Sequence, residues 1–325
     1  MNYDVIYNSS TDPYFNLAAE QYLLDRKDSR PVFMLWRNAQ TVVIGRYQNA
    51  YAEINEPFVR ENGIKVVRRL TGGGAVFHDL GNVNYSFISP KEGAAALDFA
   101  RFSAPVIDAL ACLGVNALLS GRNDIEIDSL KVSGNAQCVR GDRILHHGTL
   151  LWSADLSALD RALRVDPEKI ASKGIKSVRS RVANIREIAG SEMDAVQFID
   201  FLFARVGGTP RGFDDDEIAE ISKLRDERYG RWEWNWGESK NFSASRKRRF
   251  PYGTVEVCFD SSRGVIGEIS VCGDFFGICD ISELERSLCG VRLERGELST
   301  ALSEVACFIS GAEPAEIADL ILGRE

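Results

Sequence analysis

Apolar residues recur in short runs along the first half of the chain, and most of these runs predict β-strands. Residues 32–37 and 41–46, VFMLWR and TVVIGR, flank a short turn, which is typical of two neighbouring buried strands. In residues 124–128, isoleucines alternate with acidic residues, so one face of that strand is apolar. The runs that predict strands cover residues 32–37, 41–46, 64–70, 83–88, 124–128, 130–137 and 143–152.

Helical spacing of apolar residues predicts helices between these strands. Asp12 and Pro13 are a typical N-cap and first helical residue, and Gly63 and Gly114 are suited to end helices. The predicted helices cover residues 13–25, 51–62, 99–113, 156–163, 193–206 and 214–227. The last two helices close a large domain, which we expect to span residues 1–240.

The remainder of the chain predicts a small α+β accessory domain over residues 252–325. It has a helix capped by Asp280. Its strands are expected at 254–259 and 265–272, and its later helices at 297–309 and 314–322. Residues 241–251 are expected to be the linker. Their basic run at 245–249, SRKRR, is interpreted as a hinge, with contact to an acidic carrier domain as the alternative.

Composition narrows the class of protein. A chain of 325 residues is long enough for two domains. The net charge of -8 makes nucleic acid an unfavourable partner, because DNA and RNA binding requires many cations. No apolar run reaches the roughly 20 residues of a membrane span, and the N-terminus resembles neither a signal nor a transit peptide, so we expect a cytoplasmic protein. The seven cysteines include no C-x-x-C pair, which favours reduced thiols and does not fit a zinc site.

The stretch over residues 64–87, IKVVRRLTGGGAVFHDLGNVNYSF, is the most specific part of the sequence. Its order of strand, glycines and strand predicts a β-hairpin. No Lys-Ser/Thr follows the glycines, so it is not a P-loop. The glycine N–H groups can still form an anion-binding nest, and Arg68 and Arg69 offer planar forks for phosphate or carboxylate. The simpler alternative is a tight turn with solvated arginines.

Other residues that could carry chemistry lie after this stretch. Lys131, in LKVSGNAQ, is expected on a strand face opposite Leu130 and Val132, as a solvated or a catalytic lysine. Asp124 either caps a turn or helps to hold Mg²⁺, which prefers oxygen ligands. The loop over residues 169–186 holds six cations and no acid, which indicates an anionic ligand or a solvated basic face.

The three histidines of the chain are less informative than Lys131, Asp124 and the basic loop. His146 and His147 are adjacent on a predicted strand, so at most one of them can face a pocket. For these two and for His78, both a hydrogen-bonded structural role and a role in the site are open. Three histidines without metal-ligand spacing do not indicate zinc.

The string RRLTGGGAVFHDLGNVN resembles the signature of the lipoate–protein ligase A family in its bacterial two-domain form, with Thr71 where many members have serine. KVSGNA, the basic SKGIKSVRSRVANI and the WEWNWG stretch are also similar to that family. The resemblance implies an α/β (α+β) fold. It would have a biotin-ligase-like catalytic domain with a mixed β-sheet, followed by a small α+β C-terminal accessory domain.

The resemblance also implies an ATP-dependent, two-step reaction. Lipoate and MgATP would give lipoyl-AMP and pyrophosphate. The lipoyl group would then pass to one lysine of a carrier, either a lipoyl domain of a 2-oxoacid dehydrogenase complex or the glycine cleavage H protein. Activation is needed because a free carboxylate is a poor acylating agent. We expect ATP and Mg²⁺ as cofactors, lipoate as substrate, no nucleic acid or membrane partner, and a monomer.

The matching motifs imply a set of site residues. Lys131 corresponds to the one catalytic side chain, Asp124 is the candidate Mg²⁺ ligand, and loop 169–186 is expected to close over the adenylate. For ATP and the adenylate, the set is Arg69, Gly74, Ala75, Val76, Phe77, Asn82, Asp124, Lys131, Lys173 and Arg181. For lipoate, it is Arg69, Thr71, Gly72, Gly73, Gly74, His78, Lys131, Gly134 and His147.

Three other functions stay open from the sequence. An octanoyl or lipoyl amidotransferase of the same fold would use an acyl-cysteine, but Cys138 lies outside the motif and Cys112 has apolar helix neighbours typical of a core. A biotin ligase would need a different glycine-rich signature. A lipoate-binding protein without catalysis would not need Lys131.

Overall fold

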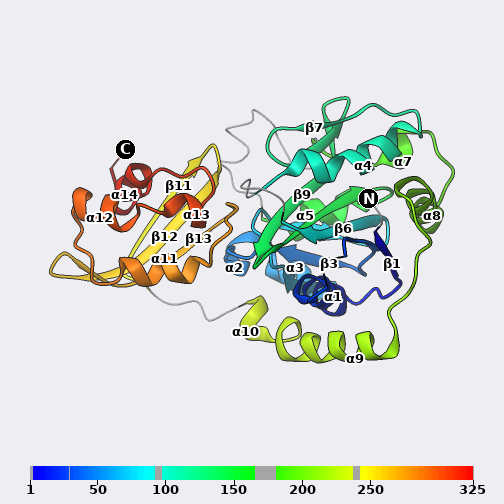
Figure 1. Ribbon diagram of the computed structural model, residues 1–325. Coiled ribbons are helices and arrows are strands. Elements are labelled where there is room, and N and C mark those ends of the chain that lie inside the picture. The colour runs from blue at the N-terminus through cyan, green and yellow to red at the C-terminus, as the bar shows by residue number, and fades with distance from the viewer. Residues whose placement is uncertain (1–2, 29, 92–96, 165–180, 237–241, 325) are drawn as a thin grey trace. The chain divides into compact units, whose positions relative to one another are not determined.

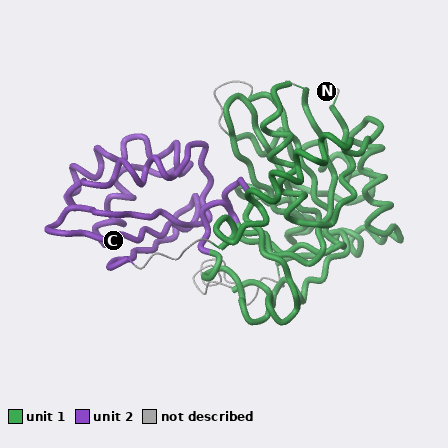
Figure 2. Tube along the Cα trace, turned by 90° about the horizontal axis from the view of Figure 1, so that it is seen from below, with its two compact units in different colours: residues 1–44, 50–69, 75–236 green, residues 45–49, 70–74, 237–325 purple. Residues whose placement is uncertain are grey.

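The structure is a computed structural model that describes residues 3–28, 30–91, 97–164, 181–236 and 242–324 (Figure 1). Its chain divides into two compact units (Figure 2). Unit 1 comprises Met1–Ile44, Ala50–Arg69 and Ala75–Trp236; unit 2 comprises Gly45–Asn49, Leu70–Gly74 and Gly237–Glu325. Two short segments of the N-terminal half, including the glycine run, therefore group with the C-terminal residues. The domain boundaries expected from the sequence stay a prediction.

Unit 1 is built on a seven-stranded mixed sheet. Its strand order is β1-β2-β6-β10-β9-β8-β7. Only the β1–β2 pair is parallel among the neighbours in this sheet. The strands are β1 (Asp4–Asn8), β2 (Val32–Trp36), β6 (Asn82–Pro90), β7 (Ala117–Ser120), β8 (Asp124–Ile127), β9 (Leu130–Arg140) and β10 (Arg143–Leu151). The mixed α/β architecture expected from the sequence is confirmed.

One face of this sheet is apolar and carries the main core of unit 1. Helices α4 (Phe99–Ala111) and α8 (Ala195–Val206) pack on it. Phe33 and Phe87 stack with ring centroids 4.8 Å apart, and Trp152 stacks on Phe198 at 3.9 Å. Large buried aromatic side chains of this kind are a major source of folding free energy.

The opposite face of the sheet is polar and carries α1 (Pro13–Asp25). Successive side chains of a strand point to opposite faces. On β6, Val83, Tyr85 and Phe87 join the apolar core, so Asn84 and Ser86 face α1. Both polar side chains are nevertheless buried. Buried polar groups are costly unless they are hydrogen-bonded, so this face is a candidate for function.

A second sheet, β4-β3-β5, corrects the expected hairpin. Strand β3 (Thr41–Ile44) lies between β4 (Lys65–Arg68), which is parallel to it, and β5 (Val76–His78), which is antiparallel. The two strands that flank the glycines therefore pair with β3 and not with each other. The glycine segment crosses from one edge of β3 to the other, which sequence proximity alone could not reveal.

Shorter elements complete unit 1, and several differ from expectation. The helix expected at 51–62 is interrupted at Asn55, and a new helix begins next to Pro57, whose ring suits a first turn. The helix expected at 214–227 ends in a π-helical segment. The elements are α2 (Ala50–Glu53), α3 (Glu56–Glu61), α5 (Leu156–Ala162), α7 (Ile185–Ile188), α9 (Asp215–Leu224), η2 (Arg225–Tyr229) and α10 (Trp232–Asn235).

Unit 2 is a small α+β unit around a three-stranded antiparallel sheet. The order β11-β12-β13 is formed by β11 (Ala244–Phe250), β12 (Gly253–Ser262) and β13 (Val265–Gly273). The interpretation of residues 245–249 as a hinge is therefore wrong, because they pair along β12. The helix expected at 297–309 is two helices. The helices are α11 (Ile281–Leu288), α12 (Arg295–Ala301), α13 (Val305–Phe308) and α14 (Pro314–Leu322).

Two cysteines of unit 2 correct the expectation that every cysteine is a reduced thiol. Cys279 and Cys307 form a disulfide, with Cα atoms 5.5 Å apart. That distance falls in the normal range for a disulfide. The two residues are 28 positions apart in the chain, so their spacing in the sequence gave no sign of the pair.

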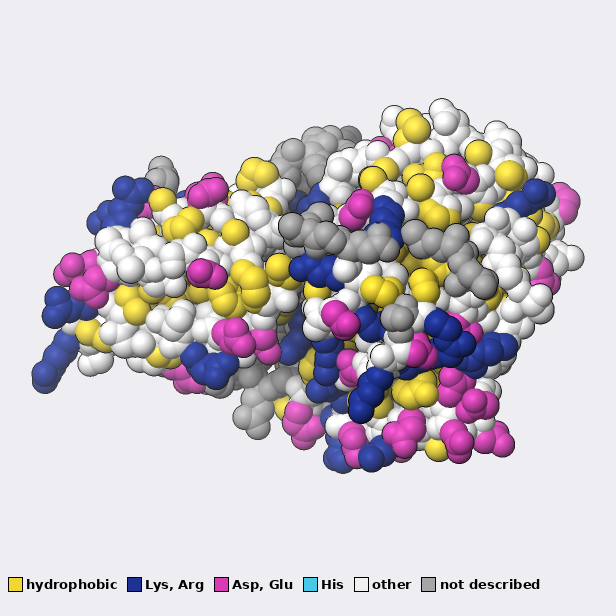
Figure 3. All heavy atoms as spheres, viewed as in Figure 1, with side chains coloured by type: hydrophobic (Ala, Val, Ile, Leu, Met, Phe, Trp, Pro, Cys, Tyr) yellow, Lys and Arg dark blue, Asp and Glu magenta, His cyan; other side chains and the backbone are white. Residues whose placement is uncertain are grey.

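Asp and Glu side chains gather over α9, as Figure 3 shows. Within the described residues, no helix is both long and apolar enough to cross a bilayer.

Gly81→Ala is expected to lower the free energy of unfolding by at least roughly 1–3 kcal/mol, the usual cost of overpacking. A Cβ on Gly81 would lie 2.1 Å from the Ser153 oxygen, while the Gly81 oxygen accepts a hydrogen bond from the Ser153 N–H. Gly212→Ala is the matched control, because a Cβ there meets nothing within 4 Å. Chemical denaturation of both variants checks this, and equal stabilities would contradict it.

Candidate active site

Lys131 lies near the start of β9, and its ammonium is paired with Asp124 of β8. The distance from Nζ to Asp124 Oδ1 is 2.7 Å, and both side chains are only partly exposed, at 29% and 19%. The two strands change register between Ile125 and Glu126, so Lys131 is opposite Glu126 while Asp124 is opposite Gly134. The side chain therefore reaches back along the strand to its partner, and sequence-predicted Lys131 and Asp124 come together.

Gly134 provides the space through which Lys131 reaches Asp124. A Cβ on Gly134 would lie 3.0 Å from Nζ and 3.2 Å from Cε of Lys131. The Gly134 N–H donates to Thr149 Oγ1 at 3.1 Å. The third predicted residue, Gly134, thus belongs to the same small cluster as the lysine and the aspartate.

A row of polar positions extends from this cluster across the polar face of the sheet. Asn84 of β6 is opposite Thr149 of β10, Thr149 bonds Gly134 of β9, and Gly134 is opposite Asp124 of β8. With strands about 4.8 Å apart, this row is roughly 14 Å long. At its other end Asn84 is opposite Trp36. The row thus connects the Lys131 end of the polar face with Trp36.

Beside this row, a buried carboxylate on α1 orients His147. Glu20 is 1% exposed, and its oxygens accept from His147 Nδ1 at 2.8 and 3.0 Å and from the Ser86 hydroxyl at 2.6 Å. Ser86 in turn accepts from Trp36 Nε1 at 2.8 Å. Glu20 therefore fixes the His147 tautomer that carries its proton on Nδ1.

The adjacent His146 points to the opposite, apolar side. Its ring stacks on Phe102 with centroids 5.3 Å apart, and its Nδ1 lies 2.7 Å from Gln137 Nε2. Burial lowers its pKa well below the ordinary value. The sequence left open which of the two histidines faces a pocket; in the structure His147 faces the polar side and His146 is part of the core.

His78, on β5, is a buried neutral imidazole. Asn38 Nδ2 donates to His78 Nδ1 at 3.1 Å. Burial and then the charge of Arg69 lower the pKa of His78 to about 3. Its Nε2 and the nearby strand atoms Asn82 Oδ1 and Asn84 Nδ2 are buried and have no hydrogen-bond partner among the described residues. Such orphaned polar atoms call for a ligand or ordered water.

The two buried, neutral histidines make stability depend on pH. The unfolded chain takes up protons near pH 6.5, whereas folded His78 does so only near pH 3, so its contribution to stability is present above 6.5 and lost as the pH falls towards 3. At pH 5 the loss is about 2 kcal/mol for His78. Burial lowers the pKa of His146 in the same direction, so His146→Phe should flatten the fall in unfolding free energy between pH 7 and pH 5. Denaturation curves at both pH values check this, and an unchanged slope would contradict it.

The paired arginines have separate environments. Arg68 holds α10: its Nε donates to the Trp234 oxygen at 2.9 Å, and its backbone N–H donates to Asn235 Oδ1 at 2.9 Å. Arg68 is therefore not a free fork for a ligand. Arg69 is 5% exposed and donates to the Val43 oxygen at 3.3 Å. Burial lowers its pKa to about 10, against the opposing effect of the Glu20 carboxylate.

The glycine run, residues 72–74, belongs to unit 2. The Gly73 N–H donates to the Phe275 oxygen at 3.2 Å, and a Cβ on Gly72 would lie 2.1 Å from that same oxygen. Thr71 is fully buried, and its oxygen accepts from the Arg46 N–H at 2.8 Å. The expectation of a nest of inward N–H groups is therefore wrong for Gly73. These glycines allow a close backbone contact instead.

The remaining sequence-predicted residues are more scattered. Phe77 is buried in an apolar cluster, with Ala75 at its margin, and Val76 is half-buried. Arg181 is half-buried and lies next to Val182, which forms a bridge to Lys131; the Ala183 N–H donates to the Lys131 oxygen at 3.0 Å. Lys173, with most of loop 169–186, lies outside the described residues.

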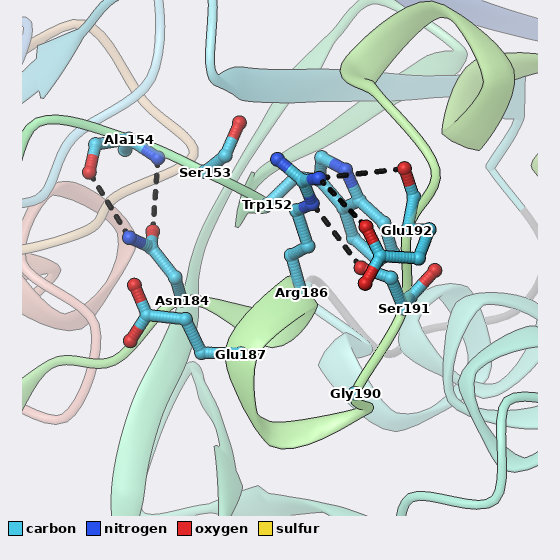
Figure 4. A pocket seen from close by; sticks show the side chains of 9 residues that line it. All are labelled: Trp152, Ser153, Ala154, Asn184, Arg186, Glu187, Gly190, Ser191 and Glu192. Carbon is cyan, nitrogen blue, oxygen red and sulfur yellow. Dashed lines mark hydrogen bonds and ion pairs between the residues drawn. The ribbon is translucent and has the colours of Figure 1, made fainter.

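A hollow of about 520 Å³ lies elsewhere in unit 1, next to α7 (Figure 4). Arg186 Nε there donates to the Ser191 oxygen, and the Asn184 amide bonds both backbone groups of Ala154. The Arg186 guanidinium and the Asn184 amide are thus used within the protein. It is lined by Trp152, Ser153, Ala154, Asn184, Arg186, Glu187, Gly190, Ser191 and Glu192. Asn184 and Arg186 belong to the end of the predicted loop 169–186, but none of the residues predicted singly for ATP, lipoate or catalysis lines this hollow, so the polar face with Lys131 is the better candidate.

Metal ligands are sparse. Within the described residues, no group of three or more His, Cys, Asp or Glu side chains could hold an ion. Asp124 offers carboxylate oxygens, which Mg²⁺ prefers as ligands. One carboxylate can hold Mg²⁺ only when phosphate oxygens and water complete the coordination shell of the ion. The residues therefore fit a metal that arrives with a nucleotide, and not a metal held by protein alone.

Several residues of the candidate site were not predicted from the sequence. Asn84 and Ser86 alternate with apolar residues in NVNYSF, and that period-two pattern is a usable signal. Glu20 sits in a helix and Trp36 in an apolar strand, and Thr149 follows His147 by two positions. These three had no local signature, because only the fold brings them to one face.

Comparison with known proteins identifies the family of this chain. The family model for the lipoyl protein ligase A/B catalytic domain matches residues 12–207, and that for the bacterial lipoate protein ligase C-terminus matches residues 239–321. Lipoate-protein ligase LplJ of Bacillus subtilis (strain 168) is 42% identical over 302 residues, which cover 90% of this chain and 91% of the relative.

Solved structures agree as well. The crystal structure of P. falciparum LipL1 in complex with lipoate has a TM-score of 0.84 and 25% identity, over 99% of this chain and 100% of its own. A lipoate-protein ligase A bound with ATP has a TM-score of 0.62 and 25% identity, over 73% of this chain and 99% of its own. The resemblance seen in the sequence is confirmed, and the chain belongs to the lipoyl protein ligase A/B family.

Proposed function

We propose that this protein is an ATP-dependent lipoate–protein ligase that forms lipoyl-AMP and transfers the lipoyl group to a lysine of a carrier protein. The observation that carries the proposal is the Lys131 ammonium, held 2.7 Å from Asp124 at one end of a polar sheet face. It is supported by the family, by a relative named lipoate-protein ligase, and by similar structures with lipoate and with ATP.

In the first step, a lipoate carboxylate oxygen attacks the α-phosphorus of ATP, and pyrophosphate leaves. A compact ammonium on a strand can contact both reacting groups as negative charge develops on the phosphate. Asp124 keeps that ammonium in place. The product is a mixed anhydride, in which AMP is a good leaving group.

In the second step, the amine of the acceptor lysine attacks the acyl carbonyl and expels AMP. Free lysine has a pKa of about 10.4, so it must lose a proton before attack. Lys131 can stabilise the leaving phosphate in this step as well. One residue would therefore serve both half-reactions.

Lipoate is proposed to lie along the polar row, with its carboxylate at Lys131 and its chain toward Trp36 and His147. This direction is supported by the apolar surface of Trp36 at the far end and by the Lys131 charge at the near end. Gly134 leaves room at the near end for the Lys131 side chain. His78 and Arg69 complete the proposed lipoate site within unit 1.

Mg²⁺ would enter with ATP, and Asp124 would be its protein ligand. When bound, the ion would neutralise charge on the phosphates. Asn82 and Arg181 are proposed to contact the nucleotide, and Lys173 joins them from outside the described residues. The backbone of residues 75–77 is also proposed to contact the adenylate.

We further propose lipoyl domains and the H protein as acceptors, a monomeric state, and a cytoplasmic location. An ATP-consuming reaction fits the compartment that supplies ATP. The Cys279–Cys307 disulfide is unusual for a reducing compartment, so mass spectrometry without reductant is a direct check of its state in the cell.

An amidotransferase that works through an acyl-cysteine is the second candidate, and the cysteines disfavour it. Cys138 is the cysteine of the Lys131 strand, and burial raises its pKa to about 12. A thiol with such a pKa has almost no thiolate at neutral pH, and the thiolate is the nucleophile. Cys138→Ala should therefore keep full activity. A large loss of activity would favour the amidotransferase.

The proposed function is tested with an apo lipoyl domain, lipoate and MgATP. Intact mass spectrometry should show a lipoyl group on the acceptor only when all three are present. Modification without ATP, from an acylated donor protein, would contradict the proposal.

A further inference from the structure

A buried amide, Asn135, lies on the side of the sheet opposite Lys131 and binds the residue before Asp124. Asn135 is 2% exposed. Its backbone N–H and its Nδ2 both donate to the Asn123 oxygen, at 2.8 and 3.0 Å. In return, Asn123 Nδ2 donates to the Asn135 oxygen at 2.6 Å. Three hydrogen bonds therefore tie these two asparagines together.

These bonds hold the start of β8 at a place where the strand pairing is weakened. The pairing of β8 with β9 begins at Asp124 opposite Gly134 and changes register one residue later. Gly121, with φ of +58°, makes the turn just before it. A strand end between a turn and an irregular register is expected to fray. The hydrogen bonds between Asn123 and Asn135 take the place of the regular inter-strand hydrogen bonds at this strand end.

Asn135 is itself anchored from a third strand. The Tyr85 hydroxyl of β6 donates a hydrogen bond to Asn135 Oδ1. A Cβ on Gly148 of β10, which lies between them, would be 2.2 Å from Asn135 Oδ1 and 2.6 Å from Tyr85 Cζ. Only glycine leaves room for this contact. A polar group inside an apolar core needs its full set of partners, and Asn135 has them.

We propose that Asn135, anchored by Tyr85, is a positioning residue that fixes the Asp124 carboxylate against the Lys131 ammonium. The proposal rests on the proposed role of Lys131 in adenylation. Lys131 has a flexible side chain, and Asp124 is its ion-pair partner among the described residues. If the start of β8 loosens, the ammonium loses its fixed place although every group that contacts substrate is still present.

The expected signature is a fall in kcat with little change in KM. Lys131 acts on charge that develops in the transition state, whereas KM for lipoate depends largely on other contacts. Misplacement by about 1 Å can cost roughly 10²-fold in rate. For Asn135→Ala we therefore expect kcat to fall roughly 10- to 100-fold, with KM for lipoate and for ATP within threefold of wild type.

Gln137 is the matched control on the same strand. It is fully buried and lies two residues along on the same face, and its amide bonds the backbone of Asp98 and the ring of His146. Gln137→Ala thus removes an equally buried amide that has no link to Asp124. It should lower the melting temperature by a similar amount and keep kcat within about twofold.

The test measures lipoate-dependent exchange of labelled pyrophosphate into ATP for wild type, Asn135→Ala, Gln137→Ala and Tyr85→Phe. Tyr85→Phe removes only the anchoring hydroxyl and should lower kcat about threefold to tenfold with KM unchanged. If Asn135→Ala does not fold, the kcat of Tyr85→Phe alone tests the positioning role of Asn135. The proposal would be overturned if kcat of Asn135→Ala equalled that of the Gln137→Ala control. It would also be overturned if kcat of Tyr85→Phe equalled that of this control.

The same assay distinguishes a failure of the proposed ligase function from a failure of the positioning role of Asn135. A wild-type protein without lipoate-dependent exchange would remove the proposed function and, with it, this role of Asn135. An active wild type with inactive Lys131→Ala keeps the proposed function, so that an unaffected Asn135→Ala then counts against the positioning role alone.

Discussion

Lys131→Ala should lower the rate of lipoate adenylation by 10²–10³, which corresponds to roughly 2.7–4 kcal/mol of lost transition-state stabilisation. The reason is that the ammonium is placed before the reaction and needs no reorganisation when charge develops on the phosphate. The melting temperature should stay close to that of wild type, because the side chain is partly exposed and its ion pair with Asp124 lies near the surface. Pyrophosphate release, followed by single-turnover kinetics, measures the effect.

Lys131→Arg should not restore the rate. A guanidinium is planar and larger, and the space above Gly134 is shaped for the lysine Cε and Nζ, which lie 3.2 and 3.0 Å from where a Cβ would be. With preformed lipoyl-AMP, Lys131→Ala should also transfer slowly, since the same ammonium contacts the leaving phosphate. A Lys131→Ala variant with a near-normal rate would shift the role to Arg69 or to loop 169–186.

Asp124→Asn should have the second largest effect, a loss of about 10- to 100-fold in the rate of adenylation, which is the usual range for a partner that orients a reactive group. The substitution keeps the shape of the side chain and removes the charge that holds Lys131 Nζ at 2.7 Å. Glu126→Gln is the matched control, because it removes the same charge from the same strand, opposite Lys131 in the ladder. It should stay within about threefold of wild type.

The Mg²⁺ dependence of Asp124→Asn separates its two proposed roles. If Asp124 is also a ligand of the nucleotide-bound ion, the Mg²⁺ concentration that gives half-maximal rate should rise, and excess Mg²⁺ should restore part of the activity. If Asp124 only orients Lys131, the rate falls and the Mg²⁺ dependence stays unchanged. Equal rates for Asp124→Asn and Glu126→Gln would contradict both roles.

The sequence predicted the long, strongly patterned elements and missed those set by tertiary contacts. Strands 124–128, 130–137 and 143–152 became β8, β9 and β10, because alternation and apolar runs are local signals. The expected hairpin around the glycines failed, because β3 from earlier in the chain lies between its two arms. Pairing partners depend on the whole fold, so no local pattern could supply them.

The same limit applies to the candidate site. Lys131, Asp124 and Gly134 were predicted as separate residues, and the register change between β8 and β9 brings them together. Glu20 is a helix residue 127 positions from His147, and its buried contact with the imidazole has no sequence signal. Motifs therefore predicted the Lys131 end of the candidate site, and the fold added the candidate residues on the rest of the polar face.

The most direct test of the account is phosphate release from ATP, lipoate and pyrophosphatase without any acceptor protein. We expect a lipoate-dependent burst close to one equivalent of lipoyl-AMP per protein, and loss of that burst in Lys131→Ala. No lipoate-dependent release by the wild-type protein, with acceptor acylation that proceeds without ATP, would contradict the account.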